Sequence, residues 1–167
     1  MDTDLMEVLH DLDKEYGFPD LEDGTYFVNF NLEGCKDVVD REGNTSYMLS
    51  WRTDNNQSIN DFWRWFRPDS KAQQGARGAV TGALKGISLH TDGAQGSALA
   101  RGVGALRNCT TEEGAIDAFE TIAQALDGLR IPIILRTGKA GFQNVVYHDR
   151  GKAIEADDPL VLDTIPA

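Results

Sequence analysis

The spacing of apolar residues predicts a helix followed by a run of strands. Leucine and valine recur every three or four residues over 4–16, which indicates an acidic amphipathic helix that ends at Gly17. Apolar and polar residues then alternate over three segments joined by short turns, at 25–33, 45–53 and 57–66. Three consecutive strands of this kind predict an antiparallel meander.

After Pro68 the spacing becomes helical, and near the C-terminus it returns to alternation. We expect the following elements in order: a helix at 70–87 that begins at a Ser70 cap, a loop at 91–96, a short helix at 97–107, a helix from Thr111 that stops at Gly128, and a hairpin of strands 131–136 and 142–148.

This order of elements predicts an α+β fold that is mainly β. It matches an OB-fold-like five-stranded barrel with a helical insertion between the third and fourth strands. We therefore divide the chain into an acidic N-terminal helix at 1–22, an OB-fold-like domain at 23–152, and an acidic, flexible tail at 153–167.

Composition limits the class of protein. The chain has 167 residues, of which 41 % are hydrophobic, enough for one domain with its own core. Cys35 and Cys109 fit neither a disulfide framework nor a metal or redox spacing, so we expect a reducing cytoplasm. Apolar runs stay well below the ~20 residues of a membrane span, and the N-terminus lacks signal-peptide features.

The net charge of −11, taken as a total, argues against a nucleic-acid partner. The distribution of charge along the chain removes this objection. Residues 1–23 contain nine acidic residues and one lysine, and 153–167 contain four acidic residues and no base. The remaining 24–152 carry a net charge of +1, with eight bases and four acids between Arg52 and Arg107. The acidity therefore belongs to the two ends, where it favours either solubility or an interaction tail.

One segment combines aromatic rings with cations, as a single-strand binder requires for bases and phosphates. Its predicted contact residues are Arg52, Phe62, Trp63, Arg64, Trp65, Phe66 and Arg67. Alternation points Phe62 and Phe66 to one side of the third strand and Trp63 and Trp65 to the other, and it leaves open which pair is exposed. If Tyr47, Leu49 and Trp51 face the core, then Met48, Ser50 and Arg52 line the solvent side.

The second hairpin has a flexible basic turn with an aromatic residue at its exit, which is suited to closing over a phosphodiester backbone. It contributes Arg136, Lys139 and Phe142 to the predicted interface, and we add Lys71 and Tyr147. A plain solvated turn is the competing interpretation. Enzyme motifs are lacking: the three histidines are scattered, and no metal-ligand spacing or complete nucleotide loop occurs, so we expect no catalysis, no metal and no cofactor.

Three stretches fit the pattern of one known family. They are Asp23-Gly24-Thr25-Tyr26-Phe27-Val28 with the later Gly43-Asn44 turn, Lys71-Ala72-Gln73-Gln74-Gly75-Ala76-Arg77-Gly78, and Gly141-Phe142-Gln143-Asn144-Val145. They resemble phage-encoded OB-fold single-stranded-DNA-binding proteins, and for a phage-encoded chain the expected cytoplasm is that of the host. The ending Asp163-Thr164-Ile165-Pro166-Ala167 is similar to the acidic ending of bacterial single-strand binding proteins, without its final aromatic residue. The resemblance implies single-stranded DNA as ligand and replication or recombination proteins as partners of a tail that includes Asp157, Asp158, Asp163 and Ile165.

Two hypotheses follow. The first is a sequence-tolerant single-stranded-DNA-binding protein of phage replication or recombination, with self-association into a homo-oligomer left open. The alternative is an acidic inhibitor, immunity protein or DNA mimic whose N-terminal segment, residues 1–23, occupies a basic cleft of a protein partner.

Overall fold

A computed structural model describes residues 5, 7–8 and 21–158. Within that part of the chain, no helix has the length and apolar character that crossing a membrane requires. The elements, in chain order, are β1 (Gly24–Phe30), the 3-10 helix η1 (Leu32–Gly34), β2 (Lys36–Val39), β3 (Thr45–Thr53), β4 (Ser58–Trp63), α2 (Ser70–Ser88), α3 (Gly93–Asn108), α4 (Glu112–Ala125), β5 (Arg130–Thr137) and β6 (Gln143–Val146).

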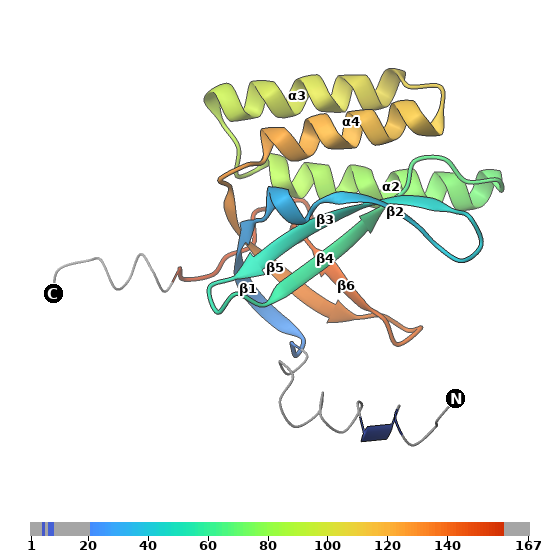
Figure 1. The fold of residues 1–167 in the computed structure, drawn as a ribbon. Helices are drawn as coiled ribbons and strands as arrows, with labels where there is room; N and C mark the ends of the chain where they lie inside the picture. Colours follow the sequence, from blue (N-terminus) through green and yellow to red (C-terminus); the bar gives the residue numbers. More distant parts are fainter. Residues whose placement is uncertain (1–4, 6, 9–20, 159–167) are drawn as a thin grey trace, which may run out of the picture.

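The strands form one curled antiparallel sheet, a half-barrel, in the order β2-β3-β1-β5-β6, and β4 pairs with the remaining edge of β3 (Figure 1). The long strand β3 is central: β2 and β1 share one of its edges, and β4 runs along the other. This curled sheet with three helices is consistent with the expected α+β class and with an OB-like fold.

The predicted strand 25–33 ends early, because β1 stops at Phe30 and the chain then packs closely against the Ser50 side chain. The chain turns through η1, and a Cβ at Gly34 would lie 2.7 Å from Ser50 Oγ, so a larger residue would not fit there. The chain then resumes as β2, which the sequence analysis missed. Because η1 covers Ser50, that side chain is only 3 % exposed, and the expectation that Ser50 faces solvent is wrong.

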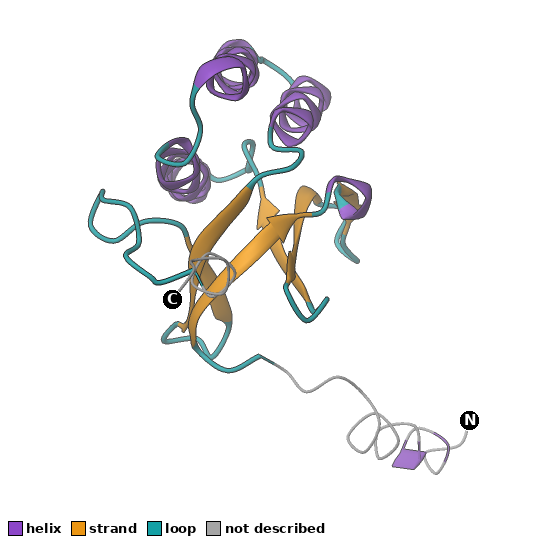
Figure 2. Ribbon diagram, turned by 90° about the vertical axis from the view of Figure 1, so that its left-hand side faces the viewer, coloured by secondary structure: helices purple, strands orange, loops and turns teal. Residues whose placement is uncertain are grey.

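Three helices lie between β4 and β5 in the chain and cover one end of the sheet (Figure 2). Asp69, rather than the predicted Ser70, caps α2, because its carboxylate accepts a hydrogen bond from the Ala72 amide at 2.9 Å. Thr111 caps α4 as expected through Gly114. Helix α3 begins at Gly93 and so includes most of the predicted loop 91–96.

The core lies between the concave face of the sheet and the helices. Tyr47, Leu49 and Trp51 on β3 are all buried, as their alternation predicts. Phe119 of α4 packs against two aromatic rings of the sheet, with ring centroids 5.9 Å from Tyr47 and 5.8 Å from Trp63. These contacts fix the helical layer over the β3–β4 half of the sheet.

The first residues of the predicted tail are attached to the domain. Ile154 is buried, and the Asp158 carboxylate pairs with Arg130 at the start of β5, which also pairs with Asp54 at 2.8 Å. Asp157, the residue before Asp158, is exposed. The other predicted tail residues, Asp163 and Ile165, lie outside the described residues, as does most of the predicted helix 4–16.

Candidate nucleic-acid interface

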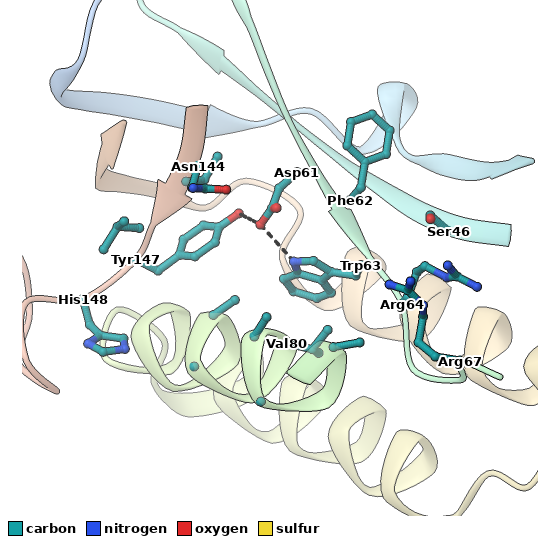
Figure 3. Close-up of a pocket in the computed structure, with 17 residues that line it drawn as sticks. Ser46, Asp61, Phe62, Trp63, Arg64, Arg67, Val80, Asn144, Tyr147 and His148 are labelled. Carbon is teal, nitrogen blue, oxygen red and sulfur yellow. Dashed lines mark hydrogen bonds between the residues drawn. The ribbon is translucent and has the colours of Figure 1, made fainter. Parts of the chain in front are cut away.

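The half-barrel is open between β4 and β6, which form no backbone ladder with each other. Side chains bridge this opening instead (Figure 3). The Tyr147 hydroxyl donates a hydrogen bond to Asp61 Oδ2 at 2.8 Å and accepts one from Trp51 Nε1 at 3.1 Å. Trp63 Nε1 donates to the same Asp61 oxygen at 2.9 Å. Four side chains, from β3, β4 and the segment after β6, therefore link the two sides of the opening.

Two cavities follow this opening, and we call them together the β4–β6 groove. The first, about 550 Å³, lies between β4, β6 and α2; the second, about 770 Å³, lies between the β3–β4 turn and the β5–β6 hairpin. Val145 lines both, so they adjoin. The side chains that line the groove and matter below are Arg52, Asn60, Asp61, Phe62, Arg64, Arg67, Thr137, Gln143, Asn144 and His148.

Small residues of α2 form the floor of the first cavity. Ala76, Ala79 and Ala83 line it together with Gly78 and Gly82, which leaves room above the helix. The next turn places Gly86 against the backbone of Tyr147, where a Cβ would lie 2.5 Å from the carbonyl oxygen. Glycine at 86 thus allows α2 to seat directly beneath the residue that bridges the opening.

The arginines of the groove form no ion pairs, since the ion pairs among the described residues belong to Arg130 alone. Arg52 donates to Asn56 Oδ1 at 2.8 Å, and Arg64 makes a long contact of 3.4 Å to Asn44 Oδ1. Arg67 is exposed. Arg52 and Arg67 therefore keep their charge available for an external anion, whereas the charge of Arg64 also acts on Asp40.

Two aromatic rings near the groove are strongly exposed. Phe62 on β4 is 57 % exposed and points away from the core, opposite Trp63 (Figure 3). Phe142, at the exit of the β5–β6 hairpin between the groove residues Gly141 and Gln143, is 76 % exposed. They are the two large aromatic side chains with this degree of exposure in the described part of the chain. Alternation left open which aromatic side of the predicted third strand is exposed, and the structure exposes Phe62 and buries Trp63.

The structure corrects the predicted role of Trp63 and Tyr147. Their exposed fractions are 3 % and 2 %, so neither ring offers a face for stacking a base. Trp65 and Phe66 do not continue the strand alternation, because β4 ends at Trp63. Both rings instead lie beside the Arg77 guanidinium, at 4.8 and 4.9 Å, and are half-buried against the helices.

The remaining predicted cations line neither cavity of the groove, although each is close in sequence to a residue that does. Lys71 is exposed in the first turn of α2, close in sequence to Arg67. Arg136 and Lys139 are exposed on the β5–β6 hairpin, whose tight turn has Gly141 at a φ of 84°. Asp23 anchors this hairpin to the start of β1 by accepting hydrogen bonds from Thr137 and Gln143.

Burial sets the charge state of the bridging carboxyl. Loss of solvent raises the pKa of Asp61 above its usual value, and the hydrogen bonds from Tyr147 and Trp63 oppose this shift. Burial and the neighbouring Asp61 charge also raise the pKa of Tyr147, which keeps its phenol protonated as a donor. No group of three metal-ligating side chains gathers within the described residues.

Sequence reasoning missed Asp61, Asn144 and His148 as groove residues. Asp61 had one local signal: it is an acid on the strand face that otherwise carries Ile59 and Trp63. Comparison with known protein families finds no matching model, and comparison with curated proteins finds no matching sequence.

Proposed function

We propose that this protein binds single-stranded DNA along the β4–β6 groove, without strong sequence preference, in phage DNA replication or recombination. The observation that carries the proposal is the pair of exposed rings, Phe62 and Phe142, beside a groove lined by Arg52, Arg64 and Arg67. Exposed aromatic rings and unpaired cations are the two components of sequence-tolerant single-strand binding. On this proposal the half-barrel is an OB-fold.

Each part of the groove has a distinct role. The rings of Phe62 and Phe142 stack on bases, while the arginines, with Lys71, Arg136 and Lys139 around them, contact phosphates. Asn60 and Asn144 present amide groups beside this path, and amides pair with the edges of every base. The acidic ends of the chain account for the net charge of −11 without removing the local positive charge.

Fluorescence anisotropy of a labelled oligo-dT with the full chain tests the proposal at low salt. Each of Phe62→Ala and Phe142→Ala should weaken binding about 5- to 150-fold, since one base stack contributes about 1–3 kcal/mol. The matched control is Leu89→Ala, which shortens a 45 % exposed side chain at the end of α2, outside the groove. Oligo-rU and duplex DNA as competitors then establish which nucleic acid is preferred.

Absence of oligo-dT binding at low salt would overturn the proposal. Equal losses of affinity in Phe62→Ala and Leu89→Ala would also contradict it, because binding would then not depend on the groove in particular. In that case the alternative is an acidic inhibitor that binds a basic protein through residues 1–23, whose net charge of −8 favours such a partner. It predicts tight binding to a basic protein and no affinity for oligonucleotides.

A further inference from the structure

A third cavity, of about 650 Å³, lies away from the β4–β6 groove, between α2 and α3, and we call it the α2–α3 groove. Leu84, Leu99 and Leu106 form its buried base, and Trp65 lies at its edge. In Figure 2, α3 and α4 lie side by side and α2 stands apart from them. A hydrophobic channel between two helices is a common seat for a third, amphipathic helix.

The charged groups on the α2–α3 groove are all basic. Lys85 of α2 and Arg107 of α3 are exposed on its lining, and no acidic residue lines it. A partner segment that carries leucines on one face and carboxylates beside them would therefore satisfy both the apolar base and the cationic rim.

This chain contains such a segment at its N-terminus. Over 4–16, Leu5, Val8, Leu9 and Leu12 follow the i, i+3, i+4, i+7 spacing of a helix that inserts into a groove, and five acidic residues stand against one lysine. The structure shows helical backbone at Leu5 and at 7–8, with Leu5 51 % and Val8 54 % exposed. The two apolar side chains of this segment that the structure describes, Leu5 and Val8, are therefore exposed to solvent.

We infer that the N-terminal segment of one copy docks in the α2–α3 groove of a second copy. The chain enters its own domain at Leu21, whose carbonyl accepts a hydrogen bond from Gln143 Nε2 at 2.9 Å. In both views the start of β1, just after this contact, lies at the end of the sheet that points away from the three helices (Figures 1 and 2). The N-terminal segment therefore joins the domain at the end opposite its own α2–α3 groove, which favours the groove of a second copy.

Docking of this kind is heterologous, because two different surfaces meet. It generates either a reciprocal exchange between two copies or a longer chain of copies. The α2–α3 groove and the β4–β6 groove are lined by different residues, so association and oligonucleotide binding are separable.

Sedimentation velocity of the full chain over a concentration series is the first test. We expect reversible association that the double substitution Leu5→Asp/Val8→Asp weakens at least tenfold, and that Lys85→Glu/Arg107→Glu weakens similarly. All four side chains are exposed, so folding should be retained. Matched controls are Val39→Asp, at a 61 % exposed position on β2, and Arg101→Glu, at an exposed position of α3 outside the groove lining; both should associate like the unchanged chain.

A charge exchange identifies the two surfaces directly. Adding Glu7→Lys/Asp11→Lys to Lys85→Glu/Arg107→Glu should restore association. If the groove substitutions had weakened association by damaging the fold, a charge change in the N-terminal segment would not reverse the loss. A labelled peptide of residues 2–17 should also bind full-length Leu5→Asp/Val8→Asp and fail to bind full-length Lys85→Glu/Arg107→Glu. A chain that stays monomeric at all concentrations overturns the inference, as does association that ignores these substitutions.

Discussion

The Tyr147 hydroxyl donates a hydrogen bond of 2.8 Å to the Asp61 carboxylate, joining two residues 86 positions apart across the opening of the half-barrel. No backbone ladder connects β4 to β6, so this side-chain contact takes the place of the missing strand pairing. Trp51 completes the arrangement by donating to Tyr147 at 3.1 Å. The width of the proposed DNA groove therefore depends on a buried polar network as well as on the sheet.

Removing the Tyr147 hydroxyl should destabilise the fold. In Tyr147→Phe, the Trp51 indole loses its acceptor, and Asp61 loses one of its donors while remaining partly buried. An unsatisfied buried group costs about 1–3 kcal/mol, so we expect the free energy of unfolding in urea to fall by that amount. For a domain of this size the melting temperature should fall by roughly 2–4 °C per kcal/mol.

Tyr26→Phe is the matched control. Its hydroxyl donates to the backbone oxygen of Glu22 at 2.6 Å in an exposed position, where water can replace it. We expect a change within about 0.5 kcal/mol. If both variants lose equal stability, the buried network has no special role.

The pKa of Asp61 predicts how stability depends on pH. Burial raises this pKa in the folded protein above the usual value of 3.8, so the folded state holds the proton to a higher pH than the unfolded chain does. Stability from this group therefore falls as the pH rises from about 3.8 through the raised folded value. Asp61→Asn keeps a hydrogen-bond acceptor without the charge. Its stability relative to the unchanged protein should increase across that window in urea titrations.

Asp23→Asn should show the opposite slope. Hydrogen bonds from Gln143 and Thr137 lower the pKa of Asp23, so its contribution is present above 3.8 and disappears as the pH falls through the lowered value. The stability deficit of Asp23→Asn should therefore shrink on acidification. Parallel slopes for the two variants would refute the assignment of the Asp61 shift.

The sequence predicted the core-facing residues of β3 correctly because that side of the strand is covered throughout, although it placed Ser50 wrongly at the solvent. Tyr47, Leu49 and Trp51 alternate with residues of lower hydrophobicity over the whole strand. The same reasoning failed beyond Trp63, because β4 ends there and successive side chains no longer point to opposite faces of a strand. Trp65 and Phe66 consequently meet one guanidinium, that of Arg77, instead of pointing in opposite directions.

Features created by contacts distant in sequence had no local signal. The short strand β2 is defined by its pairing with Thr45–Met48 and carries no alternation of its own. Tyr147 is predicted at the interface, whereas its hydrogen-bond partners Trp51 and Asp61 place it inside the protein. Exposure of Phe62 required knowing which side of β4 the helices cover.

The seat of α2 under Tyr147 should not tolerate a side chain at residue 86. A Cβ in Gly86→Ala would lie 2.5 Å from the Tyr147 carbonyl oxygen, so the helix or the segment after β6 must move. We expect a loss of about 1–3 kcal/mol in urea denaturation. Gly75→Ala in the same helix meets no atom within 4 Å and should instead stabilise the protein by about 0.5–1 kcal/mol.

The salt dependence of oligo-dT binding should report the groove arginines. Each phosphate contact on a single strand contributes about 0.7 to the slope of log K against log salt. If Arg64 and Arg67 each contact one phosphate, Arg64→Ala/Arg67→Ala should lower the magnitude of that slope by about 1.4. Arg101→Ala removes an exposed charge from α3, outside both grooves, and should leave the slope unchanged. An equal reduction in both variants would mean that net charge, rather than the β4–β6 groove, governs binding.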